Sequence, residues 1–357
     1  MKSVRLNFWI MLAALVPFFV SCEDSEEEIR GVYENGVFVL NEGGFGAANA
    51  SISFYNPSAD SISNGIFYKS TGLPLGDVGQ SMAAIDDNIF IVLNGSNKVE
   101  VVDKNDFSSV ATIEDIAGPR FIVKVSKSKA YLSAWGTNSV FVINTNDFEV
   151  TDTIEVGAGP EQIAVSGDYA YVGHSGGYGF ENYIAVVKIS TNDIVTEIET
   201  GDNPASIVAD NSGDIWTLCR GKIVYNYTDW SIVEQSASKL LKINTSTNTI
   251  EKEIEISETA HPNWLQISPD GNTVYYGGGY GFNGIFAVST SATTVPATPL
   301  IEKYFYGFSV DPDNGDIYGC EAPTFSAPGT VYRYNSAGTE LSSQTVGIGP
   351  NSVYFID

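Results

Sequence analysis

The sequence feature that most constrains the fold is a strand-like pattern that recurs along the whole chain after residue 35. In each copy a short apolar segment with an aromatic residue follows a polar turn, and no helical period separates the copies. The aromatic residues of the seven copies are Phe38, Phe90, Tyr131, Tyr171, Trp216, Tyr275 and Tyr318. An internal repeat of this kind decides the architecture, because each copy is one supersecondary unit that must stack on its neighbours.

A second pattern alternates with the first and consists of a β-rich run that ends in Asn, Asp or Ser. These runs end at Asn56, Asp103, Asn144, Ser190, Asn244, Ser289 and Asn335. Turns such as Gly118-Pro119 introduce a further strand, since Pro presets φ and Gly accepts a positive φ. Each unit therefore has strands A (after the turn), B (with the aromatic residue), C (with the polar end) and D. Seven such units predict an all-β chain, a seven-bladed β-propeller of four-stranded antiparallel blades.

The two ends of the repeated region predict how the ring closes. Residues 351–357 have the pattern of a strand A that no strand B follows. Residues 36–40 have the pattern of a strand B that no strand A precedes. We therefore expect the C-terminal strand to join the N-terminal blade, so that one propeller domain occupies residues 36–357.

The first residues of the chain do not fit the repeat. Lys2 and Arg5 precede an apolar run at residues 6–20, which is shorter than the roughly 20 residues of a membrane span. Residues 1–21 therefore have the pattern of a secretory signal peptide. The sequence Phe-Val-Ser-Cys at residues 19–22 resembles the lipobox of bacterial lipoproteins, which implies a lipidated Cys22. An ordinary signal peptide with an incidental cysteine is the alternative.

Residues 22–35 are expected to form a flexible tether after the lipidated cysteine. Residues 23–28 hold five acids and no apolar residue, so they have nothing to bury. An acidic cluster at this place resembles the surface-export signal of Bacteroidota lipoproteins. That resemblance implies a lipid-anchored outer-membrane protein that faces the cell exterior, whereas a periplasmic spacer is the alternative.

Charge and motifs exclude several classes of function. Asp and Glu number 43 against 18 Lys and Arg, a formal net charge of −25. So acidic a chain is a poor partner for nucleic acid, and it contacts a membrane only through its lipid anchor. The sequence has no HExxH, P-loop or CxxC motif. We therefore expect a binding protein, with no metal and no cofactor, rather than an enzyme, although some propellers are lactonases or other hydrolases.

The length of the connections indicates where a ligand binds. The B–C connection varies most, from the short one between Phe90 and Asp103 to the long one between Trp216 and Asn244. In a four-stranded blade the B–C loops and the D–A turns emerge on the same face. Variable loops on a rigid scaffold usually carry the binding residues, so the binding site is predicted on this face.

The candidate ligand-binding residues in these loops are mostly aromatic. They are Phe45, Asn94, Trp135, His174, Tyr178, Phe180, Arg220, Tyr227, Trp230, Tyr280, Phe282 and Phe325. Aromatic rings around a propeller mouth suit a large, flat, partly polar ligand, although packing between loops is the alternative. His174 is expected to form hydrogen bonds rather than to bind metal. The longest loop, at residues 220–238, is the expected lid, with Trp230 as its anchor.

Two charged residues are predicted close to the mouth of the channel. Arg120 and Glu161 each follow the Pro of a D–A turn, and both side chains can hydrogen-bond a ligand amide or phosphate. A salt bridge between the two residues, or between blades, is the alternative.

Sequence motifs also resemble known families. The rhythm GPxxIxV…AYV…VxVIN resembles the YVTN-type β-propeller family, which is often described as surface-layer-like. Residues 40–45, 50–57, 75–82 and 118–120 resemble the BtuG-type surface lipoproteins of Bacteroidota. These capture cobalamin and pass it to a TonB-dependent outer-membrane transporter. The resemblance implies corrinoid capture on the loop face, while another transporter cargo or an adhesion-type propeller that binds protein or glycan stays open.

Overall fold

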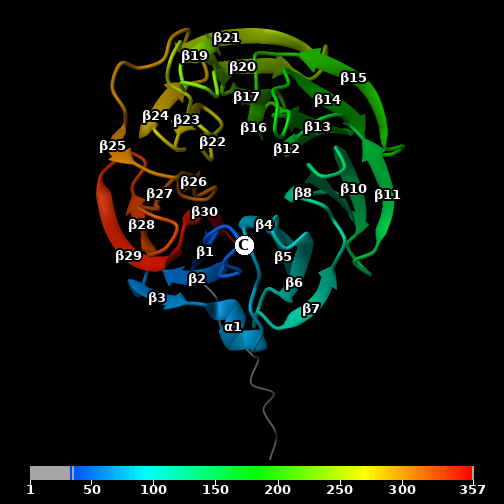
Figure 1. The fold of residues 1–357 in the computed structure, drawn as a ribbon, viewed down its shortest axis with the longest axis vertical. Helices are drawn as coiled ribbons and strands as arrows, with labels where there is room; N and C mark the ends of the chain where they lie inside the picture. The colour runs from blue at the N-terminus through cyan, green and yellow to red at the C-terminus, as the bar shows by residue number, and fades with distance from the viewer. Residues whose placement is uncertain (1–32, 34–35, 356–357) are drawn as a thin grey trace, which may run out of the picture.

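The structure is a computed structural model that describes residue 33 and residues 36–355. Its sheets form a ring of blades around a central channel (Figure 1). Seven sheets of four antiparallel strands make up the ring, which confirms the predicted seven-bladed β-propeller. The predicted signal peptide, Cys22 and the acidic tether lie outside the described residues.

Each blade runs from strand A at the channel to strand D at the rim (Figure 1). In this order the first blade consists of β30 (Pro350–Phe355), β1 (Val37–Asn41), β2 (Ser51–Asn56) and β3 (Ser61–Asn64). The second and third blades consist of β4 (Gly79–Ile85), β5 (Asn88–Leu93), β6 (Lys98–Asp103), β7 (Ser109–Ile113), β8 (Pro119–Ser126), β9 (Lys129–Ala134), β10 (Ser139–Asn144) and β11 (Val150–Glu155).

The remaining blades repeat the same arrangement. The fourth and fifth consist of β12 (Pro160–Ser166), β13 (Tyr169–His174), β14 (Tyr183–Lys188), β15 (Asp193–Glu199), β16 (Pro204–Ala209), β17 (Ile215–Cys219), β20 (Ser238–Asn244) and β21 (Thr249–Ser257). The sixth and seventh consist of β22 (Trp264–Ile267), β23 (Thr273–Gly277), β24 (Asn283–Ser289), β25 (Ile301–Tyr304), β26 (Gly307–Val310), β27 (Ile317–Glu321), β28 (Pro328–Tyr334) and β29 (Glu340–Ile348).

The ring closes through the first blade, as predicted. Strand β1 lies between β2 and β30, and its Val39 faces Ser53 on one side and Val353 on the other. All pairs in this sheet are antiparallel. The two ends of the repeated region therefore share one sheet, which leaves the propeller without an open blade.

Two elements lie outside the blades. Helix α1 (Ile66–Thr71) lies in the D–A connection between the first two blades, where the sequence had indicated no helix. It is short because Gly65 and Gly72, at its two ends, both have left-handed φ angles of 68° and 73°. Strands β18 (Ile223–Tyr225) and β19 (Ile232–Gln235) form a hairpin in the long B–C connection of the fifth blade. No helix among the described residues has the length and apolar character of a membrane span.

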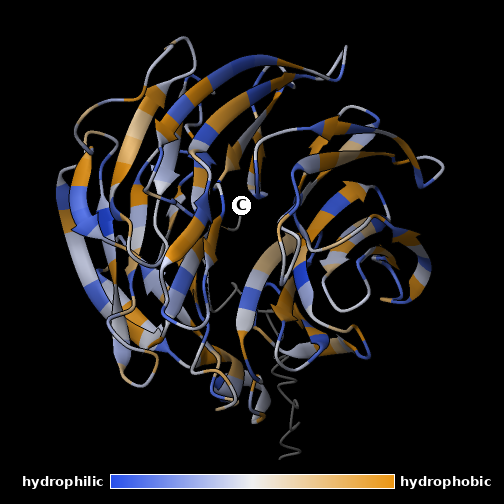
Figure 2. Cartoon of the chain, turned by 45° about the horizontal axis from the view of Figure 1, so that its top comes forward, coloured by the Kyte–Doolittle hydropathy of each residue, from blue (hydrophilic) through white to orange (hydrophobic). Residues whose placement is uncertain are grey.

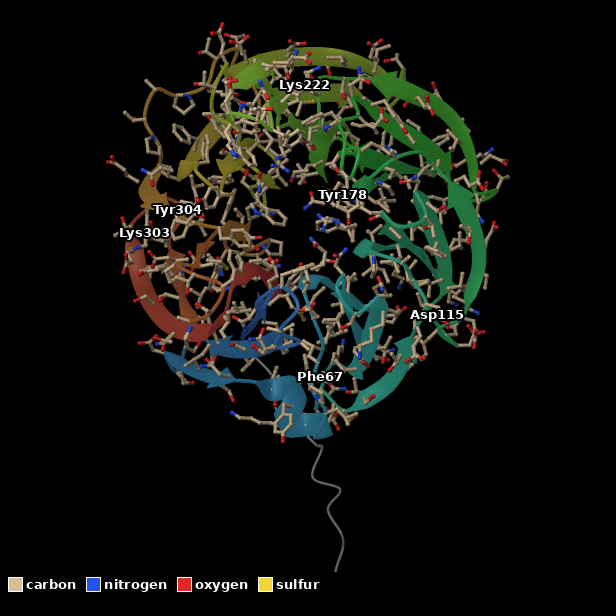
Figure 3. The ribbon with its side chains drawn as sticks, viewed as in Figure 1. Phe67, Asp115, Tyr178, Lys222, Lys303 and Tyr304 are labelled. Atoms are coloured by element: carbon tan, nitrogen blue, oxygen red, sulfur yellow. The ribbon has the colours of Figure 1, made fainter. Side chains whose placement is uncertain are left out.

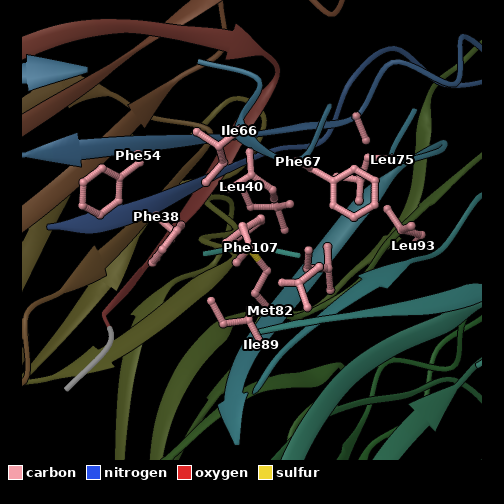
Figure 4. Close-up of a cluster of buried hydrophobic side chains, with 14 residues drawn as sticks. Phe38, Leu40, Phe54, Ile66, Phe67, Leu75, Met82, Ile89, Leu93 and Phe107 are labelled. Atoms are coloured by element: carbon pink, nitrogen blue, oxygen red, sulfur yellow. The ribbon is translucent and has the colours of Figure 1, made fainter. Parts of the chain in front are cut away.

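The core lies between the blades. The aromatic residues of strand B are at most 5% exposed, because strand B is central in its sheet and neighbouring blades cover both faces. Figure 4 shows one such layer, in which Phe38 and Phe54 of the first blade pack with Met82 and Ile89 of the second and with Phe67 of α1. Each such side chain contributes about 1.5–3 kcal/mol when fully buried. Along the rim strands hydrophobic and hydrophilic residues alternate (Figure 2).

Candidate functional site

The B–C and D–A connections surround a polar cavity of about 280 Å³ at one end of the central channel. Strand A of each blade is innermost, so residues at the start of these strands or just before them line the cavity. They include Gln80, Arg120, Glu161, Ala205, Asn263 and Asn351. Three further polar residues, Glu42, Asn94 and Arg220, reach it from B–C connections. Every blade thus contributes to one site on the predicted face, since Tyr306 adds the seventh.

The turn before strand A explains why these residues converge. Gly118, Gly159 and Gly349 each precede a Pro and have φ angles of 60°, 60° and 63°, which Gly adopts without strain. Asn203 adopts the same conformation in the fifth blade, with φ 63°. The Pro begins strand A beside the channel, and the residue after it lines the cavity.

Arg120 and Glu161 form an ion pair between the third and fourth blades. Arg120 Nη2 lies 3.0 Å from Glu161 Oε2, and Arg120 Nε donates to the same oxygen at 3.1 Å. Arg120 Nη1 donates to Gln80 Oε1 of the second blade. The guanidinium carbon lies 4.1 Å from the centre of the Trp135 ring, and Ser175 Oγ donates to Glu161 Oε1 at 3.0 Å. These contacts hold both charged groups in place at the cavity wall.

Arg220 borders the same cavity but has no such partners. Its Nε is buried, and none of the described residues accepts a hydrogen bond from its side chain or forms an ion pair with it. Burial lowers the pKa of the Arg220 guanidinium, the charge of Glu161 raises it, and the charge of Arg120 lowers it. Arginine stays protonated despite such a shift, so the cavity wall carries an unpaired positive charge.

A second acid faces the cavity from the first blade. Tyr306 Oη donates to Glu42 Oε2 at 2.9 Å. Burial raises the pKa of Glu42, against the lowering effect of the Tyr306 hydrogen bond and of the Arg120 charge. Burial raises the pKa of Tyr306 as well, so its hydroxyl keeps its proton and remains a donor.

Two aromatic residues form the floor of the cavity. Phe121 of the third blade and Trp264 of the sixth meet edge to face, with ring centres 6.4 Å apart. Both residues also line a second space of about 380 Å³ further along the channel, where Met82, Ile122 and Leu265 make the wall more apolar. The aromatic pair therefore lies between a polar mouth and a part of the channel whose wall is more apolar.

Most of the residues predicted from the sequence lie in the cavity or on the loops around it. Asn94, Arg120, Glu161 and Arg220 line the cavity. The exposed aromatic residues on the surrounding loops are Phe45, Tyr178, Phe180, Tyr227, Trp230, Tyr280 and Phe325. Trp135 is half-buried between the two groups, since its ring contacts both Arg120 and Tyr178. Figure 3 shows Tyr178 close to the centre of the ring, whereas Asp115 and Lys303 lie near the rim.

His174 and Phe282 are buried in the core, although Phe282 lies in the B–C connection before β24, so neither is exposed on the loop face as expected. His174 is the last residue of β13, is fully buried, and stacks on Tyr183 with ring centres 4.4 Å apart. Burial lowers the pKa of His174 to about 4. Phe282 is 7% exposed and packs against Tyr276 and Phe286. Both side chains are buried, and neither lines the cavity.

The expected lid at residues 220–238 is an ordered hairpin rather than an irregular loop. Its base is fastened by Lys222, whose Nζ lies 2.7 Å from a Glu234 oxygen and 3.7 Å from an Asp202 oxygen. Tyr227 and Trp230 at its tip are 85% and 69% exposed and do not line the cavity. Figure 1 shows β19 toward the rim, so the hairpin does not close over the channel in this conformation.

Sequence reasoning missed several lining residues. Asn263 and Asn351 follow the Pro of a D–A turn just as Arg120 and Glu161 do, so the same pattern would have identified them. Gln80 occupies the equivalent place without a preceding Pro. Glu42 and Tyr306 carry no comparable local signal, because they meet only when the first and seventh blades close the ring.

Comparisons with solved structures agree with the fold. A quinonprotein alcohol dehydrogenase-like protein from Bacteroides thetaiotaomicron aligns with a TM-score of 0.68 and 10% identity, over 90% of this chain and 78% of that one. A functionally unknown protein from Desulfotomaculum acetoxidans gives 0.64 and 13%, over 89% and 98%. The Kuenenia stuttgartiensis hydrazine synthase gives 0.60 and 19%, over 74% and 85%. Identities this low support the propeller fold alone.

Sequence comparisons place the chain in a family. No curated protein sequence matches it. A family model described as a domain of unknown function, DUF5074, matches residues 35–348, which include every strand of the ring except β30. The chain is therefore a member of the DUF5074 family and folds as a seven-bladed β-propeller.

Proposed function

We propose that the protein is a cell-surface lipoprotein that captures cobalamin or a related corrinoid on its loop face. It then passes the ligand to a TonB-dependent outer-membrane transporter. The observation that carries the proposal is the polar cavity at the centre of that face, surrounded by exposed aromatic loops. The motifs at residues 40–45, 50–57, 75–82 and 118–120, which resemble corrinoid-capturing propellers, support the same ligand class.

The chemistry of the face suits a corrinoid. Such a ligand is a large, flat ring with polar amide groups at its edge. Exposed rings such as Tyr178, Tyr280 and Phe45 offer apolar area at low entropic cost. The amides of Asn94 and Asn263 add donors and acceptors at the centre of the face. A ligand wider than the cavity would thus contact both the central polar groups and the surrounding aromatic residues.

The motifs at the start of the chain support a lipid anchor. We propose that residues 1–21 are a signal peptide, that Cys22 carries the lipid, and that residues 22–35 tether the propeller at 36–357 to the outer membrane. The chain's net charge of −25 gives no attraction to anionic lipid heads, so the lipid anchor holds the protein at the membrane.

Titration of the purified full chain with cobalamin, and separately with cobinamide, tests the ligand class. We expect saturable heat in calorimetry and a change in tryptophan fluorescence. A wild-type protein that is folded by circular dichroism and shows no heat with either corrinoid would contradict the proposal. Binding that survives alanine substitutions in several B–C loops at once would instead contradict the assignment of the face.

A further inference from the structure

Arg220 is the least expected feature of the central cavity. The chain has 43 acidic residues against 18 Lys and Arg, so acids that could pair with an arginine are abundant. The other two arginines that the structure describes have such partners, since Arg120 pairs with Glu161 and Arg333 with Asp316. Arg220 has none, although its Nε is buried. Chain composition therefore does not explain the missing partner.

The two acids that face the cavity are already occupied. Glu161 accepts hydrogen bonds from Arg120 and Ser175, and Glu42 accepts one from Tyr306. Neither carboxylate lies within salt-bridge distance of Arg220, although the charge of Glu161 is felt there. Because Arg220 Nε is buried without a partner, the guanidinium loses part of its hydration without compensation, which costs free energy. The fold retains that cost at the wall of the polar cavity on the loop face.

We propose that the central cavity binds an oxyanion, a carboxylate or phosphate group, on the guanidinium of Arg220. The planar fork of arginine matches both groups by two parallel N–H···O bonds. A volume of about 280 Å³ accommodates such a group, and the amide of Asn263, which also lines the cavity, offers an additional donor. Arg120 is paired with Glu161, so Arg220 supplies the positive charge that remains available to an anion in the cavity. The inference concerns the cavity itself and does not depend on the corrinoid proposal.

The experiment measures anion binding to the purified full chain without any corrinoid. Inorganic phosphate and malonate are titrated at fixed pH and constant ionic strength set with sodium chloride, by calorimetry and by the thermal unfolding midpoint. The wild type should bind at least one of the two saturably, and R220Q should bind it at least tenfold more weakly. A response to phosphate alone assigns a phosphate group, and a response to malonate alone assigns a carboxylate.

Two controls separate a site from general effects of salt and of charge. K127Q removes one positive charge from the exposed hairpin between β8 and β9 and should behave as wild type. Without anion, the unfolding midpoint of R220Q should be no lower than that of the wild type, because the replaced guanidinium has no partner to lose. R220K, which keeps the charge and loses the fork, should also bind the anion more weakly than the wild type.

Three results would overturn the proposal. One is the absence of a saturable response to either anion in the wild type. Another is equal binding by the wild type and the Arg220 variant used. The third is a large loss of stability in R220Q without anion, because that would assign Arg220 a structural partner within the fold.

Discussion

At the residue scale, the ion pair of Arg120 and Glu161 is a buried polar contact between two blades of the channel. Glu161 is almost fully buried, and its side chain accepts from residues of two blades. Removing one partner of a buried pair strands the other charge, whereas an exposed pair contributes little. The structure therefore predicts a large difference between buried and exposed Glu-to-Gln substitutions.

Glu161→Gln is expected to lower the free energy of unfolding by about 3 kcal/mol, because it leaves Arg120 without its counter-charge. The matched control is Glu253→Gln, which breaks an exposed pair with Lys239 at 2.8 Å and should cost less than about 1 kcal/mol. Urea unfolding followed by circular dichroism measures both. Equal losses in the two variants would show that the pair at the channel is not specially stabilising.

His174 predicts an acid-dependent loss of stability. Its pKa is about 4 in the folded protein against an ordinary 6.5, so the unfolded chain binds more protons between these values. Stability from this group is therefore complete above about pH 6.5 and is lost as the pH falls toward 4. The full effect is about 3 kcal/mol at most. The raised pKa of Glu42 acts in the opposite direction, so a variant comparison is needed.

The comparison uses His174→Phe, which keeps an aromatic ring against Tyr183 and removes the titrating group. We expect the difference in unfolding free energy between the variant and the wild type to shift in favour of the variant between pH 7.5 and 4.5. Denaturant unfolding at a series of pH values measures it. A difference that does not change with pH would mean that His174 is protonated alike in the folded and unfolded states.

At the scale of single elements, the β18–β19 hairpin is the largest departure from a plain blade. Its tip residues Tyr227 and Trp230 are exposed, and their rings lie 6.1 Å apart. They line no part of the central cavity, so they contact only a ligand or partner that extends beyond it. Substituting these two residues therefore tests the contribution of the loop face to binding and leaves the cavity unchanged.

Replacing Tyr227 and Trp230 by Ala should weaken corrinoid binding, if the loop face binds it, by about 2 kcal/mol each, or roughly 30-fold in Kd. The thermal midpoint should change little, because both side chains lie outside the blades. Tyr68→Ala on α1 is the control, since Tyr68 is 64% exposed but lies away from the channel. Unchanged affinity in the double variant would remove the hairpin from the binding surface.

At the scale of the whole molecule, stability depends on closing the ring. Strand β30 pairs with β1 along its length and also contributes Asn351 to the channel. An unpaired β1 would expose an edge strand whose five residues are all buried in the native blade. Such an edge favours aggregation.

Deleting residues 350–357 should therefore give insoluble or strongly destabilised protein. Deleting only residues 356–357, which lie beyond β30, is the matched control and should leave the thermal midpoint unchanged. Solubility on expression and differential scanning calorimetry measure the two truncations. A soluble 350–357 deletion with an unaltered midpoint would disprove the role of closure.

The sequence by itself determined the architecture. Short segments of sequence are enough to predict a strand. The aromatic residues of strand B and the polar ends of strand C could therefore be recognised without knowledge of the fold. The turns before strand A are equally local, since Pro and Gly restrict or free φ at single positions. Counting these signals was enough to predict seven blades and the closing strand, and Arg120 and Glu161 were placed at the channel mouth by the same turns.

Only the tertiary structure decided which side chains meet. Glu42 and Tyr306 are 264 residues apart, and Arg120 and Glu161 are 41 apart, so their contacts depend on how the blades are arranged around the axis. Burial is also a property of the neighbours, which is why His174 proved to be a core residue. The alternation of residues along a strand predicts which of them lie on one face of a blade. The packing of seven blades against one another decides which side chains converge at the channel. It also leaves the guanidinium of Arg220 there without a partner.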